Sequence, residues 1–416
     1  MWKAVDSQDS TLNSSHFFPV VAPFSDFTYF GLLLYIALPT LALGLLGRAN
    51  RRWTLIATAL VGVLNFSDDI AIRPGIFVHE LWIALGFALY QGVLAAALLR
   101  WKSKTLFRVL LVLSILPLAA AKFLPVLAPG TLFGFLGISY VTFRSLDVLF
   151  SVHDGILKSL SPGTYLAFLF FWPTVSSGPI DRYRRFVQDL DRRRTRAEFF
   201  DDLDVAVERI FRGFLYKFLI AALLSRYCVD PIEHRTDAFS TLLYMYGYSL
   251  YLFFDFAGYS AFAIGFSRLF GIRSPENFDL PFLSRNIRDF WNRWHISLSF
   301  WFRDHIYMRF LIAASKGKWF KGKHTASYLG LWLTFGLMGV WHGIETHYLL
   351  YGAYHAALLC GYDAFARWNK SSKRWPDTPF ARWLNIAITF HAVCFGLLIF
   401  SGKLTAHPAA VVVAPQ

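Results

Sequence analysis

Charged residues are scarce in this 416-residue sequence, since Asp, Glu, Lys and Arg together make up only 16% of it. An average soluble domain carries about 25% charged residues. Hydrophobic residues reach 56%, which is more than a soluble core can bury but is typical of a surface that faces lipid. The composition therefore excludes an ordinary soluble domain and predicts an all-α integral membrane protein with many spans.

Cysteine is also scarce, and its placement excludes two kinds of site. Cys228, Cys360 and Cys394 lie far apart and lack metal-ligand spacing, so neither a disulfide framework nor a metal site is expected. The phosphate-cradling G-x-x-x-x-G-K-[ST] and the nucleophilic G-x-S-x-G motifs are both missing. Because the basic clusters carry no nucleic-acid-binding motif, nucleic acid is not expected as a partner.

No cleavable signal peptide is expected either, because residues 1–26 contain no short apolar core before a small-residue cleavage site. Apolar runs approach the ~20 residues that span a bilayer at eleven places: 27–46, 53–67, 77–99, 106–124, 129–150, 163–180, 206–227, 239–268, 327–344, 348–366 and 383–402. The sequence therefore predicts an extracytoplasmic segment 1–26, a single transmembrane domain over 27–402 and a short tail 403–416.

Basic residues suggest the orientation. Arginines and lysines follow the first and third spans at Arg48, Arg51, Arg52, Arg100, Lys102 and Lys104. The positive-inside rule then places the N-terminus outside. Both 151–158 and the arginine-rich 182–196 can be cytoplasmic if 129–150 or 163–180 is re-entrant. Pro173, Gly178 and Pro179 would interrupt a helix in the second of these.

The stretch 271–304 carries too many arginines to span the bilayer. Read as a helix, 284–312 suits an amphipathic segment at the cytoplasmic interface. His295 lies within it, in FWNRWHISLSFWFRD. An interfacial anchor of Trp, Phe and Arg would explain this segment without any catalysis.

His342 lies in GVWHG at the outer end of the span 327–344. Gly339 and Gly343 beside it would let a substrate approach closely, and histidine can exchange a proton near neutral pH. His355 and His391 are also helical, and a hydrogen bond to a neighbouring helix would account for either of them. Local sequence alone does not rank His342 above His355.

The segment SRNIRDFWNRWHISLSFWFRDHIYMRF, whose histidine lies 47 residues before that of VWHG, resembles the membrane-bound O-acyltransferase (MBOAT) family. FLGISYVTFRSLDVLF, FWPTVSSGPIDRYRRF and ENFDLPFLSRNIRDFWNRWHISLS are similar to its teichoic-acid D-alanylation branch. The alginate O-acetylase branch is similar at FWNRWHISLS but usually departs after FRD. The resemblance runs from about residue 27 to 400, and His305 stands where the family usually has an aromatic residue.

This resemblance implies a ring of about 10–12 transmembrane helices, with re-entrant and interfacial helices, around a central tunnel. It implies that the catalytic residues are His342 and His295, the second histidine of the family. The protein itself would bind no cofactor. Its donor would be D-alanine carried as a thioester on the phosphopantetheine arm of an acidic cytoplasmic carrier protein, and its acceptor a hydroxyl on the outer side of a bacterial cytoplasmic membrane.

Further residues are assigned with the same resemblance in mind. We expect the carrier protein to dock on an apolar tip with flanking basic residues, namely Met308, Arg309, Leu311, Ile312 and Lys316. We expect the tunnel or donor site to include Asn292, Arg293, Trp294 and Trp341. Membrane lipid is an expected partner. A small single-span membrane partner and an extracytoplasmic partner are further candidates for the final transfer. Polysaccharide O-acetylation and a transporter with buried charges remain open alternatives.

Overall fold

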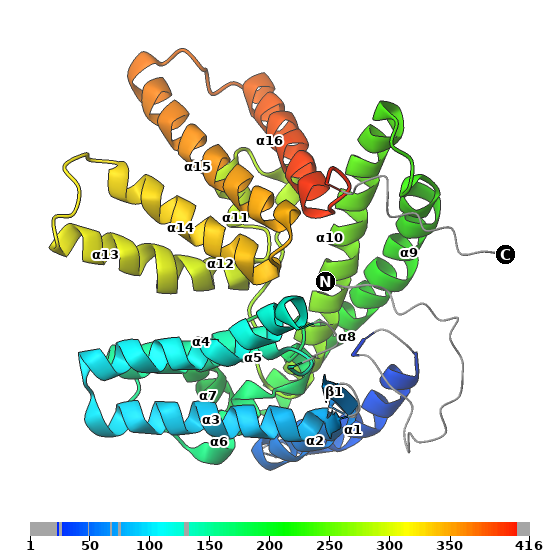
Figure 1. Ribbon diagram of the computed structural model, residues 1–416. Helices are drawn as coiled ribbons and strands as arrows, with labels where there is room; N and C mark the ends of the chain where they lie inside the picture. The colour runs from blue at the N-terminus through cyan, green and yellow to red at the C-terminus, as the bar shows by residue number, and fades with distance from the viewer. Residues whose placement is uncertain are drawn as a thin grey trace. The chain divides into compact units, whose positions relative to one another are not determined.

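The computed structural model describes residues 23–24, 27–48, 50–66, 69–73, 76–128 and 133–405. Most of this is helical, and the strands β1 (Asp69–Arg73) and β2 (Ile76–His79) form one antiparallel pair (Figure 1). The predicted segment 1–26 and the tail lie largely outside the described residues. The chain divides into two compact units, residues 1–213 with 259–275 and residues 214–258 with 276–416. The single domain over 27–402 stays a prediction.

The first unit is a set of helices joined by short connections. It contains α1 (Phe27–Leu45), α2 (Arg51–Asn65), α3 (Glu80–Trp101), α4 (Lys104–Leu127), α5 (Ile138–His153), α6 (Pro162–Leu169), α7 (Tyr183–Asp191) and α8 (Arg196–Gly213). Helices α3, α4 and α5 pack against one another. Ser103 begins α4 by accepting a hydrogen bond from the Leu106 amide at 3.3 Å, as N-cap serines commonly do.

Within the described residues, α1, α3, α4, α10 (Ala238–Leu269) and α16 (Pro379–Phe400) have the length and hydropathy to cross a membrane. Large apolar side chains on these helices point away from the protein, such as Leu89 on α3 and Val112 on α4, which are 70% and 60% exposed. Exposure of such a continuous apolar surface to water is unfavourable, whereas contact with lipid is not. The protein is therefore an all-α, multi-pass membrane protein.

The region predicted to be re-entrant is interrupted as expected. Helix α6 ends at Leu169, and a buried, mostly non-helical segment follows as far as Asp181. Residues 129–132 of the predicted span 129–150 lie outside the described residues, and the helix begins only at Ile138. Gly137 just before it has a φ of +79°, and a methyl group there would lie 2.3 Å from the carbonyl oxygen of Val175. Glycine is thus required where these two segments approach.

Arg144 explains how a charged residue is accommodated inside α5. Its side chain is only 1% exposed. One guanidinium nitrogen donates to the carbonyls of Phe168 and Leu169 at 2.9 and 2.8 Å, and the other donates to the carbonyl and hydroxyl of Thr174 at 2.6 and 2.5 Å. The arginine therefore satisfies backbone carbonyls that the interruption of the helix leaves without partners.

The second unit consists of helices from the C-terminal half and a preceding π-helical stretch, Phe214–Ala221. It contains the first part of α10 together with α9 (Ala222–Leu224), α11 (Ile287–Trp291), α12 (Ile296–Phe302), α13 (Met308–Lys316), α14 (Thr325–His342), α15 (Thr346–Ser372) and α16. Helices α14 and α15 lie side by side as a hairpin, and α16 packs on α15 (Figure 1). Lys403, just after α16, donates to the carbonyls of Ile232 and Glu233 at 3.0 and 2.6 Å.

The single amphipathic helix predicted over 284–312 is wrong, because this stretch is broken into pieces. A short helix, α11, is separated from α12 by a turn in which His295 adopts a left-handed conformation, with φ of +42°. Asn277 fixes the turn: its carbonyl accepts from the Ile296 amide at 2.9 Å, and its side-chain oxygen accepts from the Ser297 hydroxyl at 2.6 Å. The break thus depends on contacts with a distant segment, which helical periodicity does not reveal.

Candidate active site

His342 is the last residue of α14, and its ring lies among aromatic side chains from three helices. Its ring centroid lies 4.5 Å from that of Trp341, 4.9 Å from that of Phe400 on α16, and 5.9 and 6.2 Å from those of Tyr348 and Tyr351 on α15. The imidazole is only partly buried. It is therefore held in a defined position and still has access to a reacting group.

Gly339 and Gly352 set the distance between the two helices that carry this cluster. A methyl group at Gly339 would lie 2.6 Å from the carbonyl oxygen of Tyr348, and one at Gly352 would lie 2.4 Å from that of Phe335. The space at Gly339 is thus occupied by α15 and does not serve the approach of a substrate, contrary to the sequence-based expectation. Small residues allow such close contact between helix backbones.

His295 is buried within the second unit, where its ring meets that of Phe256 edge-on at 4.8 Å. Burial lowers the pKa of His295 to about 3, because the charged form loses its hydration. The imidazole is therefore neutral near pH 7. An interfacial anchor would need these side chains at the surface, but His295, Trp291 and Trp294 are all buried.

His355 on α15 is the residue whose surroundings the sequence misjudged. It is fully buried, and neither ring nitrogen has a hydrogen-bond partner in the described part of the chain. The predicted hydrogen bond to a neighbouring helix is therefore wrong. Its ring instead contacts Tyr351 at 4.5 Å and Trp291 at 5.1 Å. His391 also differs from expectation, because its Nδ1 contacts the carbonyl of Ala387 in its own helix at 2.7 Å.

These contacts form a continuous series of rings from His342 through Tyr351 and His355 to Trp291 in α11. Trp291 belongs to the motif FWNRWH, in which His295 also lies. The two segments singled out from the sequence therefore meet in one unit through side chains of α15. His355 is a rival candidate in the sequence, whereas Tyr351 has no sequence signal that distinguishes it from an ordinary core aromatic residue.

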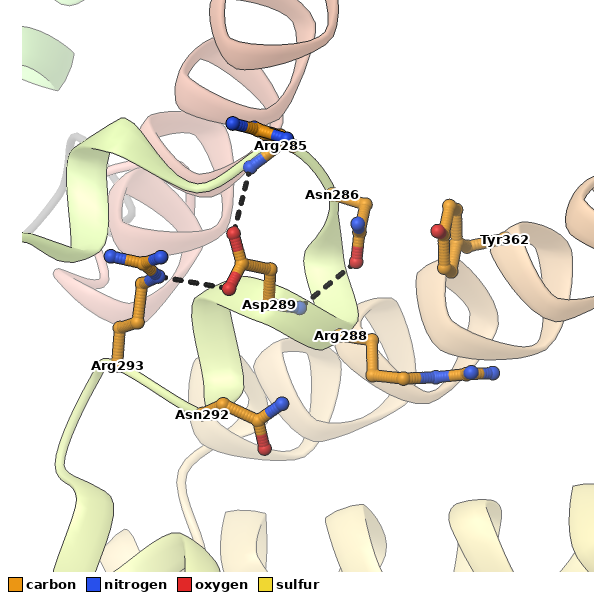
Figure 2. A pocket seen from close by; sticks show the side chains of 7 residues that line it. All are labelled: Arg285, Asn286, Arg288, Asp289, Asn292, Arg293 and Tyr362. Carbon is orange, nitrogen blue, oxygen red and sulfur yellow. Dashed lines mark hydrogen bonds and ion pairs between the residues drawn. The ribbon is translucent and has the colours of Figure 1, made fainter. Parts of the chain in front are cut away.

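Other residues of the same motif line a pocket of about 510 Å³ (Figure 2). Its lining comprises Arg285, Asn286, Arg288, Asp289, Asn292, Arg293 and Tyr362. Of the four residues predicted to serve the tunnel or donor, Asn292 and Arg293 lie here. Trp294 is instead buried against Phe278 and Phe290, and Trp341 lies beside His342. The four predicted residues thus occupy different places, and their common role stays a prediction.

The predicted carrier-binding tip corresponds to α13 and has exposed apolar side chains. Met308 is 42% exposed and Ile312 is 49% exposed, whereas Leu311 is partly buried. Lys316 is exposed and Arg309 is partly buried. Trp319, in the turn after α13, adds a further exposed aromatic surface. The character of the surface suits a protein partner, and the identity of that partner stays a prediction.

No group of three or more His, Cys, Asp or Glu residues in the described ranges is arranged to hold a metal ion. Among the described side chains, the histidines are the ones that can take up and return a proton near neutral pH. A partly accessible histidine at the end of an apolar helix in a membrane protein is by default a candidate functional residue.

Comparison with known proteins identifies the family. Residues 79–401 match the membrane-bound O-acyltransferase (MBOAT) family, so the chain belongs to that family and is an acyltransferase. It is 44% identical over 401 residues to the teichoic acid D-alanyltransferase of Bacillus subtilis (strain 168), covering 93% of this chain and all of that protein. The protein of the same name from Streptococcus thermophilus is 37% identical, covering 93% and 96%.

A second group of relatives matches more narrowly. The probable alginate O-acetylase AlgI of Pseudomonas aeruginosa is 34% identical over 233 residues, which is 54% of this chain and 42% of that protein. The resemblance noted in the sequence is therefore confirmed at the level of the family. The shared length is greater for the D-alanyltransferases.

Proposed function

We propose that this protein transfers D-alanine from the phosphopantetheine thioester of a carrier protein to a hydroxyl acceptor outside the membrane, for D-alanylation of teichoic acid or a related envelope polymer. The observation that carries this proposal is the 44% identity to a teichoic acid D-alanyltransferase over the full length of that relative. Both candidate histidines, His295 and His342, fall inside the segment that matches the acyltransferase family.

The proposed chemistry needs one base. The Nε2 or Nδ1 atom of neutral His342 accepts the proton of the acceptor hydroxyl while the hydroxyl oxygen attacks the thioester carbonyl carbon. The carbon–sulfur bond then breaks, and the imidazolium returns its proton to the leaving thiolate. General-base assistance of this kind is worth about 10²–10⁴-fold in rate. The rings of Trp341 and Phe400 would hold the imidazole in place.

His295 would have a different role in this scheme. Burial keeps its ring neutral, and the turn that it occupies connects α11 to α12. We assign it to shaping the path of the donor through a tunnel near the motif, with Asn292, Arg293, Trp294 and Trp341 as further residues of the donor path. In this scheme His342 transfers the proton, and His295 positions the donor.

Carrier docking and orientation complete the proposal. An acidic carrier protein would dock on α13 through Met308, Leu311 and Ile312, with Arg309 and Lys316 beside them. The net charge of +14 would raise its rate of encounter. The protein would lie in a bacterial cytoplasmic membrane with its N-terminus outside, and only the slim arm of the carrier would enter the bilayer. A single-span membrane partner and an extracytoplasmic partner would take part in the final transfer.

The second candidate is O-acetylation of an exported polysaccharide, which the similarity to the probable alginate O-acetylases favours. A reconstituted assay with two donors separates the candidates. We expect proteoliposomes that contain this protein to form ester-linked alanine from D-alanyl carrier protein and to form no acetyl ester from acetyl-CoA. The reverse result would replace D-alanyl transfer by acetyl transfer.

The same assay tests the catalytic histidine. His342→Ala should lower transfer at least about 100-fold while carrier binding, measured separately, is kept. His234→Ala is the matched control, because this histidine is exposed in the turn before α10. Full activity in His342→Ala would refute the assignment. Transport of the donor without any ester formation by the unaltered protein would support the transporter alternative instead.

A further inference from the structure

The pocket on α11 combines an excess of positive charge with an excess of hydrogen-bond donors. Its lining carries three arginines and a single carboxylate, that of Asp289. We propose that this pocket binds a phosphate ester, and that its occupant is the phosphodiester of the donor's phosphopantetheine arm. This inference rests on the proposed function, since only a carrier-linked donor brings such an arm. An anionic lipid headgroup is the second source of the same chemistry.

The carboxylate of Asp289 is already engaged within the protein. One oxygen accepts from Nε of Arg293 at 2.8 Å, and the other accepts from the backbone amide of Arg285 at 3.1 Å. Both bonds are drawn in Figure 2. Asp289 therefore orders the pocket and leaves its other polar groups to a ligand.

The remaining polar groups are mainly donors. Arg285 has an exposed guanidinium that forms no ion pair within the described residues. The side-chain oxygen of Asn286 accepts from the Asp289 amide at 2.9 Å, so the NH₂ group of Asn286 is the part that remains for a ligand. Asn292 and Tyr362 add an amide and a hydroxyl. A phosphodiester, which offers only acceptor oxygens and one negative charge, complements this set.

Arg288 is held in position before any ligand arrives. Its guanidinium lies over the ring of Tyr362 at 5.6 Å, and its Nη2 atom donates to the carboxylate of Asp363 at 3.0 Å. Asp363 also pairs with Arg367, so one carboxylate is shared by two arginines. The local charge therefore stays positive, and a planar guanidinium fixed in this way loses little freedom when it binds an anion.

The location of the pocket fits a donor site. Helix α11 presents Arg288 and Asp289 to the pocket, Asn292 follows directly after it, and Trp291 on the same helix contacts His355. From His355 the series of rings continues through Tyr351 to His342. One short helix thus connects a site for the phosphate end of the arm with the residues around the proposed base.

A binding measurement tests this without relying on turnover. The probes are 4′-phosphopantetheine methyl ester, which keeps the diester of the carrier-linked arm, and pantetheine, which lacks phosphate. Both would be titrated by calorimetry into the purified full chain in nanodiscs of neutral lipid. We expect the diester to bind at least about tenfold more tightly, because charge-assisted hydrogen bonds to arginine are strong.

The variants Arg285→Gln and Arg288→Gln, singly and combined, should reduce this ratio of Kd values towards one. Arg374→Gln is the control, because it removes the same charge from the exposed loop between α15 and α16 without touching the pocket. Equal binding of the two probes to the unaltered protein, or an equal loss in Arg374→Gln, would overturn the proposal.

The lipid source is distinguished by repeating the titration in nanodiscs that contain phosphatidylglycerol. If Arg285 and Arg288 are required for enrichment of that lipid while the two probes bind alike, the occupant is a lipid headgroup and the arm assignment is wrong. Failure of the proposed function looks different. It would be seen as diester binding that depends on these arginines, together with no alanyl transfer from the loaded carrier protein.

Discussion

A methyl group placed on Gly352 of α15 would lie 3.5 Å from the Cα atom of Gly339 on α14. The two glycines therefore face each other at a close approach of the two helices in the hairpin that carries His342. Their contact ties the position of the proposed base, three residues after Gly339, to the spacing of two helices. This spacing can be altered without touching any reacting group.

We expect Gly352→Ala to lower both activity and stability. The added methyl would meet the carbonyl oxygen of Phe335 at 2.4 Å, so the helices must separate, and overpacking of this kind typically costs about 1–3 kcal/mol. Gly361→Ala in the same helix is the control, because a methyl there meets nothing within 4 Å. Thermal unfolding in detergent and the transfer assay provide the two measurements. Equal behaviour of the two variants would contradict the proposed role of the close contact.

Arg144→Leu should destabilise the first unit by at least about 3 kcal/mol, because it leaves the buried carbonyls of Phe168, Leu169 and Thr174 without their donor. Arg144→Lys should recover only part of this loss, since an ammonium cannot reproduce the planar fork. Proteolysis near residues 170–181 would report local opening. A leucine variant as stable as the parent would show that the arginine is not what holds this segment.

His355→Phe should keep or raise the stability of the protein. The substitution keeps an aromatic ring between Tyr351 and Trp291 but removes two buried nitrogen atoms that have no hydrogen-bond partner among the described residues. Each such group costs about 1–3 kcal/mol. His355→Ala should be strongly destabilising, because it leaves a cavity. Thermal unfolding decides between these results. A phenylalanine variant less stable than the parent would mean that the nitrogen atoms have a partner such as a buried water.

Titration of His295 predicts a pH dependence of stability. Burial lowers the pKa of His295 to about 3 in the folded protein, whereas a histidine in an unfolded chain has a pKa near 6.5. Below about pH 6.5 the histidine binds a proton in the unfolded state but not in the folded state. The contribution of the neutral imidazole to stability is therefore present above pH 6.5 and is lost as the pH falls towards about 3. The slope approaches about 1.4 kcal/mol per pH unit.

His295→Asn isolates this contribution. Asparagine tolerates the left-handed backbone at this position and does not titrate. The parent should therefore lose stability more steeply than the variant between pH 7 and pH 5, as measured by unfolding midpoints in detergent. If the unfolding midpoints of the two proteins fall in parallel with pH, the buried imidazole of His295 does not contribute to the pH dependence of stability.

Much of the fold could be predicted from apolar runs, because the lipid phase imposes a length and a composition on each span. The predicted spans 77–99, 106–124 and 327–344 correspond to helices α3, α4 and α14, within a few residues. The interruption after Leu169 was also predictable, since Pro173 and Pro179 cannot continue a helix. In each case the information lies within one short stretch of chain.

The remaining features depend on distant partners. The turn at His295 is fixed by Asn277, and the two terminal nitrogens of Arg144 donate to carbonyls 24 to 30 residues further on. Nothing in YGAYHA indicates that the ring of His355 packs between those of Tyr351 and Trp291. The pocket likewise brings Tyr362 to residues of α11. Periodicity reports which residues share a face of a helix, but not which distant segment packs on that face.

Lys403 has a practical consequence for handling this protein. Its ammonium group binds two carbonyls of the segment before α10 and lies 4.3 Å from the centre of the Tyr244 ring. The polypeptide just after α16 is thereby fastened to its own unit. An affinity tag or fluorescent fusion should accordingly be joined beyond Thr405. Truncation before Lys403 would release the end of α16, whose Phe400 supports His342. A low activity of such a truncated protein could then not be separated from a loss of folded protein.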